Sequence, residues 1–238
     1  MGSAVEPVTD RTPRPVRHPV LTQDWRDVCF VHWTLDPDTA APFLPPGTRP
    51  DAVDGDTYVG LVAFRMVGTG PPRLPVPYLG TFCETNVRLY AVDRYGRRGV
   101  VFLSLDAERA LPALVGRTVG LPYQWSAMRL TRDGDRCTYS CRRRGPDAAG
   151  AYGRIVVRVG APVTRTTPLE RFLTARWGLY ARGRYLPNEH PPWPLHRADL
   201  LDLADDLVPA TGLPVPVGPP VSVLWSPGVP ARFGLPRR

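Results

Sequence analysis

The sequence predicts an α+β domain that is mainly β, with a largely antiparallel sheet and a few helices. Seven segments are rich in Val, Tyr, Phe, Trp and Thr, the residues that favour strands. Short loops with turn-forming residues, such as DRYGRRG and TRDGD, join several of these segments and favour hairpins. Helix-start signals or helical periodicity occur at only three places. Together these observations indicate the fold class.

The strand-forming segments lie mostly in the middle of the chain, where prolines are few. The expected strands are Asp27–Leu35, Thr57–Val67, Phe82–Asp93, Gly99–Leu105, Tyr123–Thr131, Arg136–Arg144 and Arg154–Ala161. A chain of 238 residues buries roughly 70% of its unfolded surface, so a core of this kind needs no disulfide or metal.

Three helices interrupt this pattern. We expect them after Asp36, over about Ala107–Val119, and from Thr167 to about Tyr180. The first follows an Asp-Pro start signal and must end before Pro45. The third begins with the capping box Thr167-Pro168-Leu169-Glu170, in which proline occupies the first helical position.

Composition divides the chain into three parts. Residues 1–20 hold four prolines without periodicity and are expected to form a flexible N-terminal arm unless something docks it. Residues 21–208 form a single domain. Residues 209–238 are a Pro-rich C-terminal extension, in which Val221, Val223 and Trp225 could add an edge strand.

All 30 basic residues are arginine, because the sequence contains no lysine. This excludes enzymes that form a Schiff base on a lysine amine and nucleotide enzymes that use a phosphate-loop lysine. An arginine-only composition is typical of GC-rich codon usage, so the net charge of +8 gives nucleic-acid binding little weight. It stays a minor alternative, based on clusters such as Arg142–Arg144.

The chain lacks both a run of about 18 apolar residues and the continuous apolar core of a signal peptide near its start. We therefore expect a cytoplasmic protein without a membrane partner. Its cysteines and histidines lack a metal-ligand spacing, so neither a metal nor another cofactor is expected.

The strand Phe82–Asp93 carries the most informative alternation. Apolar residues and Thr85 occupy one face, and the other face holds Glu84, Asn86, Arg88 and Tyr90. This polar face is either a solvated outer surface or the interior of a closed sheet. In an interior, these side chains would bind a small carboxylate or enolate and move a proton.

Two other segments hold candidate site residues. The segment NEHPPWPLHRADL, with His190, Trp193 and His196, is interpreted as a proline-stiffened loop that covers a pocket rather than as a metal site. His190 as a general base stays open. Tyr123 follows the expected second helix, at an element end where site residues are common, although packing in the core is the alternative.

Five segments in the same order resemble the domain-of-unknown-function family 2071, the YqjF-like proteins. The resemblance spans about residues 20–200. The segments are CFVHWTLDPDTAAPFLPPGTRPDAVDGDTYVGLVAFRM, FCETNVRLYAV, GVVFLSLDAERALPALVGRTVGLPY, PLERFLTARWGLY and HPPWPLHRA. That family is similar in fold to acetoacetate decarboxylase, which implies an antiparallel β-cone or closed barrel around an internal cavity, with outer helices.

The resemblance also bears on the site residues. The F-x-E-x-N-x-R segment resembles the decarboxylase strand that sends a glutamate into the cavity, which favours the interior interpretation of Glu84 and Arg88. The segment Gly120–Gln124 resembles the stretch that carries the decarboxylase's Schiff-base lysine, and Tyr123 stands in the lysine's place. Amine-catalysed decarboxylation is therefore excluded for this chain.

Two functions of different class follow. The first is a cofactor-independent enzyme for small oxo-acid, lactone or enolisable substrates, in which Arg88 clamps a carboxylate, Glu84 shuttles a proton and Tyr123 donates to an oxyanion. The ligand-binding residues would be Asn86, Tyr90, His190 and Trp193. The second is a non-catalytic module that binds a small ligand in the same pocket. For both functions we expect an anionic small molecule as the partner, and both functions are compatible with a homo-oligomer.

Overall fold

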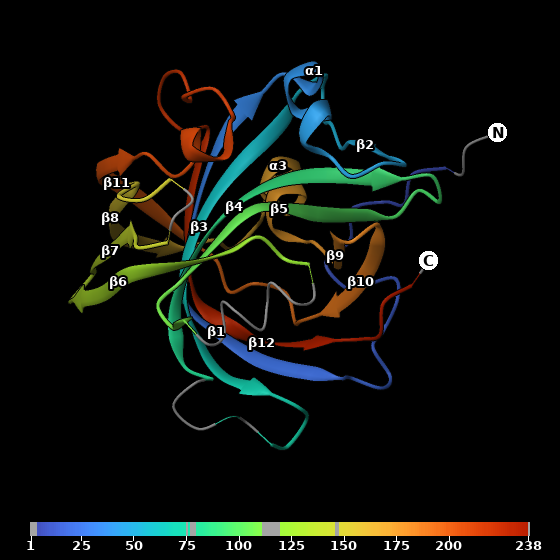
Figure 1. Ribbon diagram of the computed structural model, residues 1–238, viewed down its shortest axis with the longest axis horizontal. Coiled ribbons are helices and arrows are strands. Elements are labelled where there is room, and N and C mark those ends of the chain that lie inside the picture. The colour runs from blue at the N-terminus through green and yellow to red at the C-terminus, as the bar shows by residue number, and fades with distance from the viewer. Residues whose placement is uncertain (1–3, 75, 77–79, 111–119, 146–147, 238) are drawn as a thin grey trace.

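Twelve strands form one sheet that closes on itself in the computed structural model, which describes residues 4–74, 76, 80–110, 120–145 and 148–237 (Figure 1). The strands are β1 (Leu21–Leu35), β2 (Thr48–Pro50), β3 (Thr57–Gly70), β4 (Phe82–Asp93), β5 (Arg98–Ala107), β6 (Tyr123–Asp133), β7 (Arg136–Arg143), β8 (Tyr152–Pro162), β9 (Gly178–Ala181), β10 (Arg184–Glu189), β11 (His196–Asp205) and β12 (Ser222–Phe233). The helices are α1 (Pro37–Ala40), α3 (Pro168–Thr174) and the 3-10 turns η1 (Ala41–Phe43) and η2 (Pro209–Thr211).

The sheet closes in two rings that share one wall. Strands β5, β6, β7, β8, β11, β12, β1, β3 and β4 follow one another, and pairing of β4 with β5 closes them into a barrel. On the other side, β9 pairs with β5 and β10 pairs with both β9 and β12. Strands β12, β1, β3, β4 and β5 therefore wall both rings. The predicted closed barrel is confirmed.

The nine-stranded ring is filled by apolar side chains. They come from β1, β3, β4, β7, β8 and β12 and include Val31, Leu61, Leu89, Val157 and Trp225, each almost completely buried. Pairing within the rings is antiparallel except where β5 meets β6 and β9. The opposite face of the shared strands is thus left to line the second ring.

A bulge in β1 sets which side chains face that second ring. Asp27 has a φ of +51°, and the register with β3 shifts between Arg26 and Cys29. Its carbonyl accepts a hydrogen bond of 2.7 Å from the hydroxyl of Tyr139. The shift changes the alternation along the strand, so Trp25 before it and Val28 after it both face the same cavity.

The seven predicted strands are all present as β1 and β3 to β8, with ends that differ by a few residues. β1 is the main exception, because it begins six residues earlier, at Leu21. Strands β2, β9, β10 and β11 were not predicted. The segment interpreted as one proline-stiffened loop is in fact the end of β10, a loop at residues 190–195 and the start of β11.

The predicted third helix is correct at its start and wrong at its end. In the capping box, Glu170 N donates to Thr167 Oγ1 at 3.1 Å and Thr167 N donates to Glu170 Oε2 at 2.8 Å. The helix ends at Thr174 rather than near Tyr180, because Gly178–Ala181 forms β9. The first helix matches its prediction. In the second, Ala107 is the last residue of β5, and 111–119 lie outside the described residues.

The C-terminal segment is not an edge strand. β12 pairs with β1 from Phe233 to Ser222 and also with β10 and β11, so it lies inside the closed sheet. The edge-strand prediction is wrong because it was based on the many prolines of the segment, and only Pro227 and Pro230 fall within the strand.

The N-terminal segment is docked on the barrel from residue 4 onward. Glu6 N donates to Gly96 O at 3.0 Å, and Trp177 Nε1 donates to Thr9 O at 3.1 Å. Val16 is buried, and its N–H donates to Glu189 Oε2 at 2.8 Å. Residues 4–20 therefore do not form the free arm that their composition suggested. None of the described helices has the length and apolar character needed to cross a membrane.

Candidate functional site

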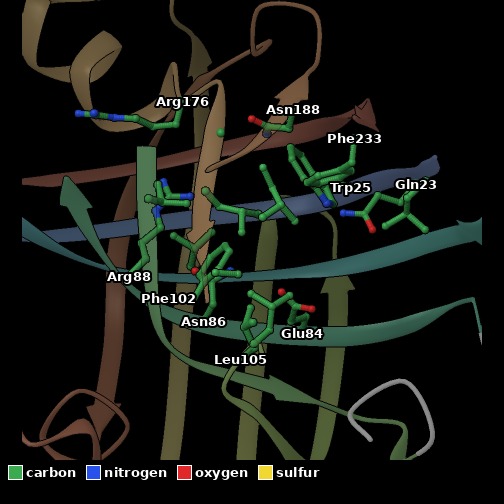
Figure 2. A pocket seen from close by; sticks show the side chains of 18 of the residues that line it. Gln23, Trp25, Glu84, Asn86, Arg88, Phe102, Leu105, Arg176, Asn188 and Phe233 are labelled. Carbon is green, nitrogen blue, oxygen red and sulfur yellow. The ribbon is translucent and has the colours of Figure 1, made fainter. Parts of the chain in front are cut away.

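A cavity of about 780 Å³ occupies the second ring, between the shared wall, β9 and β10, and the loop 190–195 (Figure 2). Most of its lining is apolar or aromatic. These side chains include Trp25, Val28, Phe30, Val62, Phe64, Met66, Val100, Phe102, Leu105, Leu179, Leu186 and Phe233. A concave, mainly apolar space with a few polar groups is typical of a small-molecule site.

The polar face of β4 points into this cavity. Glu84, Asn86 and Arg88 all line it, whereas Val87 and Leu89 of the opposite face pack in the barrel core. Glu84 and Asn86 are each only 3% exposed. The solvated-surface interpretation of this strand is therefore wrong.

Glu84 lies in an environment that favours its neutral form. The Tyr123 hydroxyl donates to Glu84 Oε2 at 3.0 Å. Burial raises the pKa of Glu84 from its ordinary 4.5 to about 7, although hydrogen bonds from Tyr123 and Asn86 act in the opposite direction. Burial and the nearby Glu84 charge raise the pKa of Tyr123 well above its usual value. Near neutral pH, Glu84 can therefore both accept and release a proton.

Arg88 is held in place without a carboxylate partner. Its Nε donates to Tyr90 Oη at 3.2 Å and one terminal nitrogen donates to Leu173 O at 3.0 Å. No ion pair joins Arg88 to an acidic residue in the described part of the chain. An ideal Cβ on Gly60 would lie 3.3 Å from the Arg88 Cγ and 2.9 Å from the His32 ring. Glycine at position 60 thus makes room for the Arg88 stem.

Tyr90 supports Arg88 rather than lining the cavity. It is completely buried, its hydroxyl donates to Leu173 O at 3.0 Å, and it lies 2.7 Å from His32 Nε2. The expectation that Tyr90 binds ligand directly is corrected, because α3 covers this end of the strand. Burial, with Arg88 and Arg176 nearby, lowers the pKa of His32 well below its usual value, so His32 is neutral.

The loop 190–195 forms an aromatic wall of the cavity. Trp193 stacks on Trp25 with ring centroids 5.6 Å apart, and its Nε1 donates to Thr174 O at 3.1 Å. His190 packs against Trp177 with ring centroids 4.6 Å apart, and its Nδ1 lies 2.7 Å from Pro191 O. Both His190 and Trp193 line the cavity.

His190 is poorly suited to act as a general base. Burial lowers its pKa to about 4, so the imidazole, which is neutral at pH 7, is only a weak base. A proton would be taken from substrate more readily by Glu84, whose pKa is higher. His196, by contrast, lies on β11, and its Nδ1 is 3.0 Å from Gly160 O.

Several residues at the site were not predicted. Gln23 and Asn188 line the cavity, and Asn188 Oδ1 is buried without a hydrogen-bond partner. Arg176 also contributes to the lining. Its guanidinium carbon lies 4.5 Å from the Tyr90 ring centroid, and it pairs with the buried Asp51, as Arg98 does. These partners lie far apart in the sequence, so no local pattern could join them.

In the described part of the chain, no group of three or more His, Cys, Asp or Glu side chains is arranged to hold a metal ion. The cysteines Cys29, Cys83, Cys137 and Cys141 are free thiols, and all but Cys83 are buried.

Solved structures share this fold. The chain superposes on acetoacetate decarboxylase from Legionella pneumophila with a TM-score of 0.64 and 15% identity, covering 100% of this chain and 98% of that one. It superposes on the enduracididine biosynthesis enzyme MppR, complexed with pyruvate, with a TM-score of 0.64 and 18% identity, covering 94% and 92%. An acetoacetate decarboxylase-like enzyme from Sphingomonas wittichii RW1 gives 0.63 and 14%, covering 100% and 98%. At these identities the likeness shows the fold alone.

Sequence comparison is more specific. The uncharacterized protein YqjF of Bacillus subtilis (strain 168) is 30% identical over 209 residues, which is 85% of this chain and 86% of that protein. The family model DUF2071, described as an uncharacterized conserved protein, matches residues 22–230. The match thus runs from β1 to β12 and includes every strand that lines the cavity, and the chain belongs to the DUF2071 family.

Proposed function

We propose that the chain is a cofactor-independent enzyme that moves a proton on an enolisable oxo acid or related carbonyl compound bound in the cavity. One observation carries the proposal: a buried glutamate, Glu84, has a pKa of about 7 and is hydrogen bonded to a tyrosine inside an apolar cavity. A general base of this pKa works well near neutral pH.

The charge of the lining supports an anionic ligand. Arg88 contributes a positive charge with which no carboxylate of the described residues pairs. Arg176 also lines the cavity and shares the carboxylate of Asp51 with Arg98, so these three residues carry one further net positive charge. With Glu84 largely neutral below pH 7, an empty cavity is therefore cationic. A carboxylate bound to Arg88 would restore the balance through charge-assisted hydrogen bonds.

The proposed step is a proton transfer. Ionised Glu84 takes a proton from the carbon next to the substrate carbonyl, so the C–H bond breaks and an O–H bond forms on Glu84. The electron pair moves to the carbonyl oxygen, giving an enolate. The Tyr123 hydroxyl then donates to this oxygen instead of to Glu84. The reaction uses no Schiff base, because the chain has no lysine.

The fold neighbours give the proposal circumstantial support. One is described as complexed with pyruvate, and two others as acetoacetate decarboxylase or an enzyme like it. Each of these names contains or concerns an oxo acid.

A thermal-shift screen tests the proposal. The wild type, Arg88→Ala and the exposed-site control Arg129→Ala are screened against oxo acids, lactones, other carboxylates and inorganic phosphate, and hits are incubated in D₂O and followed by NMR. We expect an oxo acid to raise the midpoint of the wild type and the control but not of Arg88→Ala, and to exchange the hydrogen next to its carbonyl for deuterium. A ligand that binds but exchanges no hydrogen would instead favour the binding module. Ligands that stabilise the wild type and Arg88→Ala equally would contradict both the enzyme and the binding module.

A further inference from the structure

The proton-transfer group and the anion anchor lie far apart in the cavity. Glu84 and Arg88 are four residues apart on β4, which places their Cα atoms roughly 13 Å from each other at about 3.3 Å per residue. Figure 2 shows the two residues at separate places in the lining, with Asn86 between them.

The hydrogen bonds hold the two side chains apart. Arg88 donates to Tyr90 and to the carbonyl of Leu173 on α3, so its guanidinium is drawn away from Glu84. Glu84 is bound to Tyr123 at the start of β6, at the other end of the polar row. Moving Arg88 toward Glu84 would break both of its hydrogen bonds.

A short 2-oxo acid cannot contact both groups. In pyruvate the carbon that loses a proton is only two bonds from the carboxylate carbon. A carboxylate held by Arg88 therefore leaves this carbon out of reach of Glu84. Between the two sites lies Asn86, and apolar side chains flank it on both neighbouring strands, Val62 on β3 and Leu105 on β5.

The size of the cavity leads to the same conclusion. A water molecule occupies about 30 Å³ in the liquid, and a three-carbon acid occupies only a few times that volume. The cavity of about 780 Å³ is therefore many times larger than such an acid. Phe30, Phe64 and Phe102 belong to the lining. Apolar ligand surface against these rings would be stabilised by its removal from water.

We propose that the substrate is a medium-chain oxo acid whose ketone is separated from the carboxylate by an apolar spacer of several methylene groups. The inference rests on the proposed function and names its substrate class. Arg88 binds the carboxylate, the spacer lies along Val62, Leu105 and Phe102, and the ketone lies at Glu84 and Tyr123. Proton transfer then takes place at a carbon next to the ketone, with the bond changes already described.

Calorimetry on a series of acids tests the spacer. The series is pyruvate, 4-oxopentanoate, 6-oxoheptanoate and 8-oxononanoate, with heptanoate as the analogue that lacks the ketone. We expect Kd to fall by about fourfold per added methylene until the spacer fits the distance. Heptanoate binds more weakly than 6-oxoheptanoate, because nothing reaches Tyr123. Affinity that is greatest for pyruvate, or independent of the spacer, overturns the proposal.

Two variants block the space between the anchors. Val62→Phe and Leu105→Phe each place a ring beside Asn86. Two positions are used so that the test needs only one folded variant, and thermal unfolding checks the folding of each. In a folded variant we expect at least tenfold weaker binding of 6-oxoheptanoate with pyruvate binding changed by less than twofold. An unchanged Kd for 6-oxoheptanoate in a folded variant contradicts the proposed position of the spacer.

The results separate this inference from the proposed function. Long acids that bind but exchange no protons in D₂O support the ligand class and contradict the enzyme. Pyruvate that binds best and exchanges its protons supports the enzyme and contradicts the spacer. Acids that all fail to bind contradict both.

Discussion

Glu84 is a carboxyl group that the fold removes almost completely from water. Its pKa rises from 4.5 to about 7, so between these pH values the folded protein keeps a proton that the unfolded chain has released. Stability must then fall as the pH rises through this window, by up to about 3 kcal/mol. The cavity thus contains a group that costs stability at the pH where it is proposed to act.

Glu84→Gln should remove that pH dependence. Glutamine has no ionisable group, so the variant gains stability relative to the wild type between pH 5 and pH 8. Urea unfolding of both proteins at the two pH values measures the difference, and Asp199→Asn, which changes an exposed carboxyl group on β11, is the control. The same pH dependence in wild type and Glu84→Gln would show that burial does not raise this pKa.

Gly60→Ala should weaken ligand binding without touching the ligand. The added methyl would lie 2.9 Å from the His32 ring and 3.3 Å from the Arg88 Cγ. The His32 ring, which contacts Tyr90, must therefore shift, and the Arg88 stem must give way slightly. We expect a loss of affinity for a bound carboxylate in the same direction as for Arg88→Ala, measured by calorimetry. Gly145→Ala is the control, since among the described residues its added Cβ contacts only Gln124 Oε1, at 3.6 Å. Equal affinity in the wild type, Gly60→Ala and Gly145→Ala would contradict this role of Gly60.

Sequence alternation was sufficient to group Glu84, Asn86 and Arg88 but not to orient them. Whether that face meets water or a cavity depends on ring closure, and only the family resemblance favoured the cavity. Tyr90 was misassigned because α3, which is distant in sequence, covers it. His32 was not predicted for the same reason, since its partner Tyr90 is 58 residues away.

At the scale of elements, α3 is a short helix that supports the anion anchor. Its capping box fixes the start, and Leu173 near its end offers the carbonyl that binds Arg88 and Tyr90. The start was predictable because capping is local. The end was not, since the apolar spacing continues to Tyr180 while sheet pairing converts Gly178–Ala181 into β9.

Thr167→Ala should destabilise the protein by about 1 kcal/mol, because the Glu170 N–H loses its side-chain acceptor. It should also weaken carboxylate binding, since the position of the Leu173 carbonyl depends on the helix. Urea unfolding and calorimetry measure the two effects. The control is Thr164→Ala, an exposed threonine just before the cap. If stability falls while carboxylate binding is unchanged, α3 does not support the site.

At the scale of the whole molecule, β12 closes both rings. It pairs with β1 and β11 in the filled barrel and with β10 in the ring around the cavity. This closure could not be predicted from the proline-rich terminal segment, because pairing between strands some 200 residues apart has no local sequence signature. The hairpins β4–β5 and β6–β7 were predictable, since their turns are local.

A chain that ends at Pro220 should therefore fail to fold. Without β12 the edges of β1 and β11 are unpaired and the core around Trp225 is open. Far-UV circular dichroism and the dispersion of amide signals in NMR measure the outcome. A chain that ends at Gly234 keeps β12 and should fold. A folded, cooperative chain lacking β12 would mean that ring closure is not required.

The proposed function depends on the claim that Glu84 moves a proton on a ligand in the cavity. Proton NMR of an oxo acid in D₂O follows this directly, because each transfer replaces hydrogen by deuterium next to the ketone. We predict exchange that rises with pH to a plateau above about pH 7, as Glu84 ionises, and that Glu84→Gln abolishes while still binding the acid. Equal exchange by the wild type and Glu84→Gln, or none by a wild type that binds the acid, would contradict the claim.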